Sequence, residues 1–263
     1  MFILQCDQSY KNGTDYAIIK DLLKNSHFDY AEMKSDDFYF NNQIKYKKDF
    51  PTNIQNGIPI GDIKFTTTFL KIFKNIDKIN PIEVPQILRT DEFLKRKYAI
   101  IKGDSLPQNG RFFVKNASSL KDFTFVGDIA DLKTDIVIDK NEYYLISEIV
   151  DIFAEYRIYF LNGKIYAIAY YNGNPCIFPD IKFIQKANLI YSTQKEYPKS
   201  YTMDIMVNNK GTSIVEVHLF FSCGLYQTVI GIDFLQGYLD AMKYVENFNT
   251  PPIPFHNFIP KIN

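Results

Sequence analysis

Apolar and polar residues alternate between Tyr201 and His218, and this alternation predicts a β-hairpin. One β-rich run ends at Val207 and another begins at Thr212, with two asparagines, a lysine and a glycine between them. Asn and Gly favour the tight turns that join antiparallel strands. If the loop is Asn209-Lys210-Gly211, with Gly211 in the left-handed conformation, Asp204 lies directly across from Glu216. The same register gathers five apolar residues on the opposite face: Met203, Ile205, Val207, Val215 and Val217.

A second hairpin is predicted at Asn162-Gly163, a dipeptide that suits a two-residue turn. Its strands run over residues 156–161 and 164–171. This loop length places Glu155, Arg157 and Tyr159 on one face of the hairpin. The same register adds Ile168 and Tyr170 to that face.

The opening of the chain reads as a small βαβ-like unit, with a strand at 2–5, a helix at 14–24 and a strand at 30–33. Thr14 and Asp15 are candidate N-caps of the helix. Its expected apolar face consists of Ala17, Ile18, Leu22 and Leu23.

The remaining pattern mixes helices and strands, so the predicted fold class is α+β. The apolar run at 65–73 is compatible with a helix or a strand, and the prolines between 81 and 107 indicate a connector into a second subdomain. Further predicted elements are strands at 112–115 and 143–150, an amphipathic helix at 231–247 and an extended tail from 250.

Composition describes an ordinary soluble globular protein: 263 residues, 46% hydrophobic and 23% charged. The 30 basic and 30 acidic residues balance, which disfavours nucleic acid or an anionic membrane as a partner. No apolar run approaches the ~20 residues that span a bilayer, and the amino terminus lacks the basic leader of a signal peptide. Cys6, Cys176 and Cys223 have no metal or redox spacing, so we expect reduced thiols and a cytoplasmic protein.

The facing acids Asp204 and Glu216 favour a cation between them, because like charges across a ladder repel. Mg²⁺ suits such a pair, since it takes carboxylate oxygens and substrate phosphates. On this interpretation Asp204→Asn should leave the metal-free fold at least as stable as the wild type. A solvated acidic face on an amphipathic hairpin is the open alternative.

Glu155 and Arg157 form a pattern that suits a nucleotide, because a carboxylate accepts ribose hydroxyls and a guanidinium binds phosphate. Lys115, at the end of the strand at 112–115, is a further candidate. A surface Glu–Arg pair and a solvated lysine are the alternatives for these residues.

Six short motifs follow one another in a fixed order: Phe112-Phe113-Val114-Lys115, Leu120-Lys121-Asp122-Phe123, Ser147-Glu148-Ile149-Val150, Glu155-Tyr156-Arg157-Ile158-Tyr159, Met203-Asp204-Ile205 and Val215-Glu216-Val217-His218. In this series the chain resembles the ATP-grasp ligases, and in particular a clade of small bacterial and phage proteins named for one arginine and two lysines. The resemblance covers roughly residues 111–226. It implies an ATP-grasp fold, with two α+β lobes that clamp ATP, behind a small Rossmann-like α/β domain. The implied domains are 1–85 and 86–263, with the lobe boundary near 147–151.

The resemblance also implies the site. Lys115 would bind the α/β-phosphates, and Lys121, on a flap, the β/γ-phosphates. The backbone of Glu148, Ile149 and Val150 would read adenine, and Glu155 would bind ribose. Arg157 would stabilise the transferred phosphoryl group and the acyl-phosphate oxyanion, so Arg157 and Lys121 are the implied catalytic residues. Asp204 and Glu216 would hold Mg²⁺, with Glu216 bridging two ions.

His218 departs from the family pattern, in which Asn usually follows two residues after the bridging Glu. An imidazole can ligate a metal, but Mg²⁺ prefers oxygen, so His218 leaves Mn²⁺ open as the ion and an ordinary histidine open as its role. The implied activity joins a carboxylate to an amine or a thiol through an acyl phosphate, on a small-molecule, peptide or protein substrate. The alternative is a domain that binds nucleotide as a regulatory or interaction module. A homodimer is left open.

Ser222 and Gly224 follow where related enzymes close the acceptor side of the site, and they are candidate donors to a substrate carboxylate. Cys223 reads as a small packed thiol, because no base lies beside it in the sequence. His27 and His256 lie outside the motif series and read as structural or surface residues.

Overall fold

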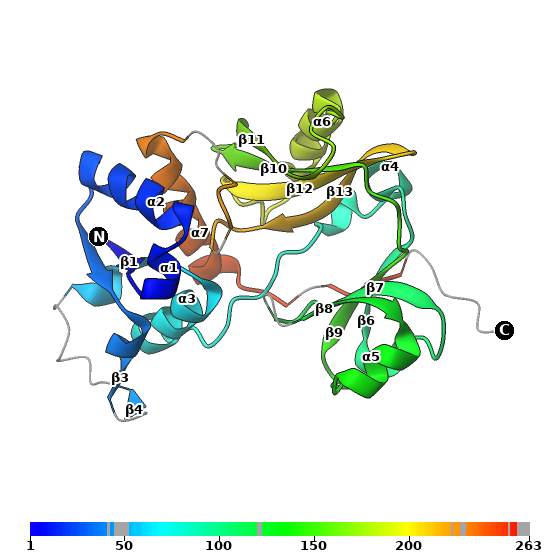
Figure 1. The fold of residues 1–263 in the computed structure, drawn as a ribbon, viewed down its shortest axis with the longest axis horizontal. Helices are drawn as coiled ribbons and strands as arrows, with labels where there is room; N and C mark the ends of the chain where they lie inside the picture. Colours follow the sequence, from blue (N-terminus) through cyan, green and yellow to red (C-terminus); the bar gives the residue numbers. More distant parts are fainter. Residues whose placement is uncertain are drawn as a thin grey trace.

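The structure is a computed structural model that describes residues 1–40, 43–44, 53–119, 123–221, 223–226, 230–251 and 253–256. Three main sheets organise this part of the chain, each with helices against it (Figure 1). In Figure 1 the four-stranded sheet lies across the top, the five-stranded sheet lies at the lower right, and the three-stranded sheet lies at the left.

The first sheet is parallel, in the order β2-β1-β5. Three of its elements agree with the predicted opening unit: β1 Phe2–Gln5, α2 Thr14–Asn25 and β2 Tyr30–Met33. Three others were not part of that prediction: α1 Gln8–Lys11, β5 Ile58–Ile60 and α3 Ile63–Phe69. A short two-stranded pair joins β3 Tyr39–Phe40 to β4 Gln43–Ile44.

Helix α2 has Gly13 as its N-cap, one residue earlier than the predicted caps, and it buries a partly different stripe. Leu22 and Leu23 are buried and Ile18 packs partly buried against the core, as expected, and Tyr16 and Ile19 are buried as well. Ala17 is exposed. The ambiguous run at 65–73 is helical, with α3 continuing into a π-helical turn at Leu70–Lys74.

The second sheet is antiparallel, in the order β14-β6-β9-β7-β8, and α5 packs on one face of it. Its elements are β6 Tyr98–Lys102, β7 Arg111–Asn116, β8 Thr124–Asp128, α5 Ile129–Asp135, β9 Tyr143–Ser147 and β14 Phe255–His256. Strand β9 ends at Ser147, three residues before the predicted end, so 148–150 lie outside it. The extended tail pairs with β6 through β14.

The third sheet is antiparallel, in the order β11-β10-β12-β13, and α6 covers one of its faces (Figure 1). Its elements are β10 Ala154–Leu161, β11 Lys164–Gly173, α6 Ile181–Tyr191, β12 Tyr201–Asn208 and β13 Gly211–His218. Helix α4, Asp91–Leu94, contacts β13.

The hairpin of β12 and β13 places Asp204 opposite Glu216, as predicted, but by a different route. The turn is the two-residue loop Asn209-Lys210, and Gly211 follows it with φ of +91°. A bulge at Val215 then restores the register before Glu216. Val215 was assigned to the opposite face, which is wrong, because it lines the same cavity as Glu216.

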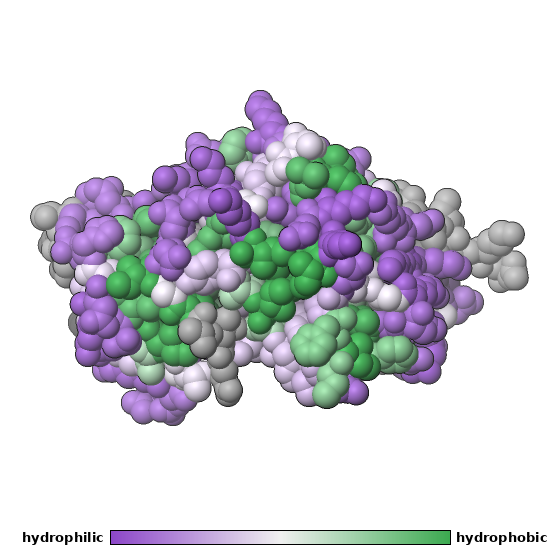
Figure 2. Space-filling model, turned by 90° about the horizontal axis from the view of Figure 1, so that it is seen from above, coloured by the Kyte–Doolittle hydropathy of each residue, from purple (hydrophilic) through white to green (hydrophobic). Residues whose placement is uncertain are grey.

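The hairpin of β10 and β11 turns at Asn162-Gly163 as predicted, but two bulges shift its pairing. Arg157 therefore pairs with Ala169. Ile168 and Tyr170 pair with Ile158 and Tyr156 on the other face, so their predicted placement beside Arg157 is wrong. Each is 39% exposed there. Seen from above, the molecule has a mainly hydrophilic surface that hydrophobic patches interrupt (Figure 2).

The closing helix is α7, Leu235–Phe248, and it packs into the core of the first sheet. Gly237 of α7 lies against the ring of Phe220, which is fully buried among the rings of Tyr159, Phe234 and Tyr238. None of the helices in the described part of the chain has the length and apolar run that crossing a bilayer needs.

We predict that Gly237→Ala destabilises the protein. An added Cβ would lie 2.1 Å from two ring carbons of Phe220, and the enclosing rings leave Phe220 little room to move. Overpacking costs ~1–3 kcal/mol, which should exceed the ~1 kcal/mol that Ala gains over Gly in a helix. Chemical denaturation measures the free energy of unfolding of this variant. The control is Lys243→Ala, on the exposed side of the same helix. A stabilised Gly237→Ala would contradict the packing described here.

Candidate functional site

Three charged residues lie side by side across neighbouring strands of the third sheet. Arg157 on β10 pairs in register with Asp204 on β12, and Asp204 pairs with Glu216 on β13. His218 lies two residues beyond Glu216, and therefore on the same face of the sheet. This face is opposite the one that α6 covers, because Tyr156, Ile158 and their neighbours on the alternate positions form the core beneath α6.

Arg157 and Asp204 form a bidentate ion pair that is almost fully buried. Nε and Nη2 of Arg157 each donate to one carboxylate oxygen of Asp204 at 2.7 Å. Arg157 is 6% exposed and Asp204 is 2% exposed. This pair corrects the expectation that Asp204→Asn would not destabilise the metal-free fold, because Asp204 already has a cation beside it.

Lys115, at the end of β7, lies between two acids. Its Nζ is 2.6 Å from Oε2 of Glu216 and 3.0 Å from Oε2 of Glu83. Glu83 is buried in the connector, where its backbone has a φ of +49°. A left-handed conformation is strained for a residue with a side chain, so the surrounding structure holds Glu83 in place against that cost.

Neighbouring charges stabilise the charged forms of Glu216, Lys115 and Arg157. Burial would raise the pKa of Glu216, but the positive charges and hydrogen bonds of His218 and Lys115 hold it well below its ordinary value. Burial would lower the pKa of Lys115, and the negative charges of Glu216 and Glu83 raise it instead. The pKa of Arg157 is likewise raised by Asp204 against the effect of burial.

A cavity of about 290 Å³ lies against this charged face and has an aromatic side. The rings of Tyr171 and Tyr226 stack 4.8 Å apart, and the guanidinium of Arg157 lies 4.9 Å from the ring of Tyr226. Tyr226 has a left-handed φ of +48°. The lining comprises Ile63, Pro81, Glu83, Lys115, Asn116, Ser119, Phe123, Thr124, Arg157, Tyr171, Asp204, Glu216, His218, Phe221, Cys223, Gly224 and Tyr226.

A second cavity, of about 240 Å³, adjoins the first at Lys115 and Glu216, which line both. Its walls are mainly apolar, with Phe113, Leu145 and Met206 among them. Glu148, Ile149 and Val150, directly after β9, and Glu155 on β10 line it as well. Glu155 accepts hydrogen bonds from Asn172 at 2.6 Å and from the hydroxyl of Tyr171 at 3.4 Å.

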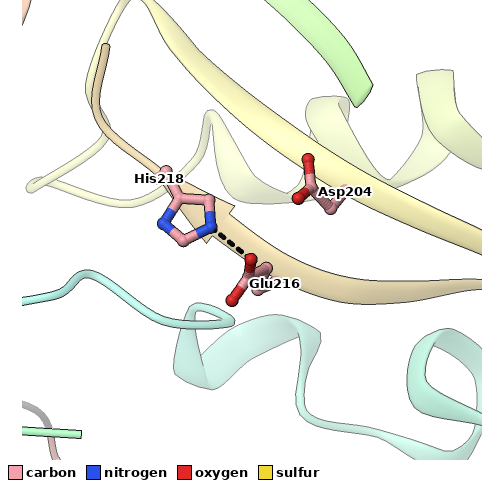
Figure 3. A group of neighbouring side chains, drawn as sticks. All are labelled: Asp204, Glu216 and His218. Carbon is pink, nitrogen blue, oxygen red and sulfur yellow. Dashed lines mark ion pairs between the residues drawn. The ribbon is translucent and has the colours of Figure 1, made fainter. Parts of the chain in front are cut away.

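Asp204, Glu216 and His218 form a group whose ligand atoms lie within 4.8 Å of one another (Figure 3). In Figure 3 Asp204 comes from β12, and Glu216 and His218 come from β13 with Nε2 of His218 turned to Oε1 of Glu216. These two atoms are 2.6 Å apart. Two carboxylates and an imidazole at this spacing fit a divalent cation, although cationic side chains now contact both acids.

The structure brings together nine of the ten candidate residues, five on the charged face and four around the second cavity. Lys121 lies outside the described residues, as does Ser222. The carbonyl of Gly224 accepts hydrogen bonds from Tyr159 and Arg157, and its expected role as a donor to a substrate carboxylate stays a prediction. Cys223 is buried and its thiol donates to the carbonyl of Phe220, in agreement with a packed thiol.

Sequence reasoning missed Glu83, Tyr171 and Tyr226. Glu83 lies between two prolines in a segment that read as a connector, and no spacing relates it to Lys115. Tyr171 lies at a bulge that shifts β11, and Tyr226 lies in a loop where its backbone is left-handed.

The fold and this site define an ATP-grasp protein, and the predicted α+β ATP-grasp fold is confirmed. The family model that matches is the ATP-grasp domain of family 2 in the clade named for one arginine and two lysines. It covers residues 93–232, more than half of the chain, and the chain belongs to this family. None of the curated proteins compared with the chain matches it.

Solved structures with the same fold include three ligases. D-alanine–D-alanine ligase from Bacillus anthracis has a TM-score of 0.52 and 13% identity, over 94% of this chain and 96% of that one. D-cycloserine synthetase DcsG has a TM-score of 0.53 and 10% identity, over 92% of this chain and 99% of that one. L-amino acid ligase from Bacillus licheniformis has a TM-score of 0.53 and 10% identity, over 95% of this chain and 77% of that one. Identities this low relate the fold and not the substrate.

We predict that Asp204→Asn destabilises the metal-free protein by ~3 kcal/mol, because breaking a buried ion pair leaves a buried charge uncompensated. Arg157→Met should cost a similar amount, and the double variant should cost less than the two single changes added together. Urea denaturation in EDTA measures all three.

The control for this prediction is Glu92→Gln, which breaks an exposed ion pair with Lys186 and should cost less than ~1 kcal/mol. Strictly additive effects of Asp204→Asn and Arg157→Met would show that the two side chains do not stabilise each other.

Proposed function

We propose that this protein is an ATP-dependent, ADP-forming ligase that joins a carboxylate to an amine or a thiol through an acyl phosphate. The observation that carries the proposal is the row of Arg157, Asp204 and Glu216 across one sheet, with Lys115 reaching it from the other. These are the residue types that phosphoryl transfer requires, since its catalysis rests on positioning and on charge stabilisation.

The cations of the site neutralise its acids. Lys115 contacts Glu216, and Arg157 contacts Asp204. We propose that Lys115 turns from Glu216 to the phosphates when nucleotide enters, and that Arg157 does the same toward the transferred phosphoryl group. Both cations then keep an anionic partner, so the exchange avoids leaving a charge buried alone.

We propose that Asp204, Glu216 and His218 hold a divalent ion, Mg²⁺ or Mn²⁺. When bound, this ion supplies positive charge that offsets the charge of the phosphates. The carboxylate oxygens now paired with Lys115 and Arg157 would be available to hold it if those side chains turned to the nucleotide.

The second cavity is the proposed site of the adenosine. Its apolar walls suit a flat base, and the backbone after β9 offers hydrogen-bonding groups beside it. Glu155 would accept the ribose hydroxyls in place of Asn172 and Tyr171. Lys121 is assigned to the β/γ-phosphates from the family pattern.

The first cavity extends past the charged face to Phe123, Phe221, Tyr171 and Tyr226, where we propose that the carboxylate and its acceptor bind. This lining favours a substrate with an apolar or aromatic group. Amino acids, the class that the names of two structural relatives suggest, are compatible with it.

We propose domains at 1–85 and 86–263, with the lobe boundary near 147–151. The support is that residues 148–150 connect the second sheet to the third. Helix α7 belongs by sequence to the second domain and packs in the core of the first sheet, so the two domains share that core.

A nucleotide-binding module without ligase activity is the second candidate function. His218 favours it, because its Nε2 contacts the Glu216 oxygen that a metal would need. Release of ADP in the presence of amino acids and peptides separates the two candidates: a ligase turns over, and a module does not.

We predict that Mg·ATP raises the melting temperature, because a ligand at 100 times its Kd adds about 2.7 kcal/mol of stability. Lys115→Ala should weaken nucleotide binding at least tenfold. Differential scanning fluorimetry and isothermal titration calorimetry measure the two effects.

Lys102→Ala, an exposed lysine on β6, is the matched control and should bind nucleotide as the wild type does. If neither Mg·ATP nor ADP shifts the melting temperature of the wild type, the proposed function fails. Normal affinity in Lys115→Ala would remove this lysine from the site.

We also predict that His218→Asn preserves or raises Mg²⁺-dependent ADP release, since the amide oxygen suits Mg²⁺ better than an imidazole. ADP release is measured with Mg²⁺ and with Mn²⁺ for both proteins. An inactive His218→Asn beside a wild type that turns over far better with Mn²⁺ would identify the histidine as a metal ligand.

A further inference from the structure

Arg96 is a buried arginine that none of the assignments above includes. It follows α4, is 9% exposed and donates to three backbone carbonyls and one hydroxyl. Nη1 donates to the carbonyls of Ile214 at 2.6 Å and Leu94 at 3.2 Å. Nη2 donates to the carbonyl of Val215 at 3.1 Å, and Nε donates to Oγ of Ser147 at 3.0 Å.

The carbonyls of Ile214 and Val215 belong to the bulge in β13. The two strands keep one register from the turn to the pair Ile205 and Ile214. From the pair Asp204 and Glu216 onward, the register is shifted by one residue of β13. Val215 is the extra residue. A bulge interrupts the ladder of backbone hydrogen bonds, so its carbonyl groups need other donors.

The bulge decides which way Glu216 points. If the register near the turn continued, Val215 would face Asp204 and Glu216 would face Met203, which is fully buried in the core. A shift of one residue moves a side chain to the other face of the sheet. The acid pair therefore exists only while the bulge is in place.

Arg96 also joins this bulge to the nucleotide side. Ser147, which accepts from Arg96, is the last residue of β9 and donates to the carbonyl of Glu148 at 3.1 Å. Arg96 thus links β13, which carries Glu216, to the end of β9, where the segment that lines the second cavity begins.

We propose that Arg96 is a positioning residue for the metal and nucleotide site: it stabilises the bulge at Val215 and so keeps Glu216 opposite Asp204. The proposal rests on the proposed function for its consequence in metal binding. A lysine could not replace Arg96 fully, because only the planar guanidinium presents fixed donors to several acceptors at once.

Deleting Val215 offers a specific rescue. Without the extra residue the register near the turn continues unbroken, and it still pairs the shortened strand with Glu216 opposite Asp204 and Val217 opposite Met203. A hairpin without a bulge should not need Arg96.

The experiment measures the Kd of ATP by calorimetry with Mg²⁺ and with EDTA, and takes the ratio as the metal increment. We expect the metal increment to fall at least tenfold in Arg96→Met. Deletion of Val215 in the same variant should restore most of the increment. Arg89→Met is the matched control, because Arg89 is 5% exposed and donates to carbonyls of Val84 and Ile253, away from β13. Arg89→Met should lower the stability of the protein and leave the metal increment unchanged.

An unchanged increment in Arg96→Met overturns the proposal. So does a loss that deletion of Val215 leaves in place, or an equal loss in Arg89→Met, because general destabilisation would explain either result. If Arg96→Met does not fold, Arg96→Lys, with a smaller expected loss and the same rescue, replaces it.

Hydrogen exchange of the metal-free protein distinguishes this proposal from the proposed function. Residues 214–218 should exchange faster in Arg96→Met and not in Arg89→Met, whether or not the protein binds nucleotide. Unchanged exchange overturns the role of Arg96. A wild type with no metal increment, beside the expected exchange, overturns the proposed function alone.

Discussion

The buried ion pair between Arg157 and Asp204 is the constraint on which the site depends. Both side chains are nearly inaccessible to water, so neither can exist there without a partner. Lys115 and Glu216 repeat the arrangement beside it, with Glu83 on the far side of the lysine. The charged face is therefore stable as a set, because each acid contacts at least one base and Lys115 contacts two acids. Removing Arg157 or Asp204 would leave its partner buried without an opposite charge, so this pair explains how the sheet carries charges at nearly inaccessible positions.

Under the proposed function, the same arrangement would let a preformed site respond to a ligand. A nucleotide with its metal ion would bring both signs of charge: the phosphates would replace the carboxylates as partners of Lys115 and Arg157, and the ion would replace the lysine and arginine as partner of the acids. The number of buried charges left unpaired would then not rise. A phosphate alone or a metal alone would lack half of the partners, so the proposal favours binding of both together.

The sequence predicted the faces of single strands better than it predicted the pairing between strands. The side-chain period of a single strand is two residues, and it placed Glu155, Arg157 and Tyr159 on one face correctly. Pairing depends on every residue between the turn and the site. In β12 and β13 the assumed loop was one residue too long and the bulge at Val215 was overlooked, and the two errors cancelled at Asp204 and Glu216. In β10 and β11 the turn was correct and the bulges were overlooked, so Ile168 and Tyr170 fell on the wrong face.

The residues that escaped prediction share a physical reason. Glu83 and Tyr226 reach the site from irregular backbone with a left-handed φ, a conformation that their residue types do not announce. Arg96 reaches a bulge that itself has no sequence signal, because Val215 looks like any other β-branched residue in a strand. Periodicity thus identifies groups whose placement follows from regular structure, and it misses those that hold the irregular structure in place. In this protein the charged residues Lys115, Arg157, Asp204 and Glu216 lie on strands with a regular side-chain period, while Glu83, Tyr226 and Arg96, which contact them or the bulge beside them, come from irregular segments.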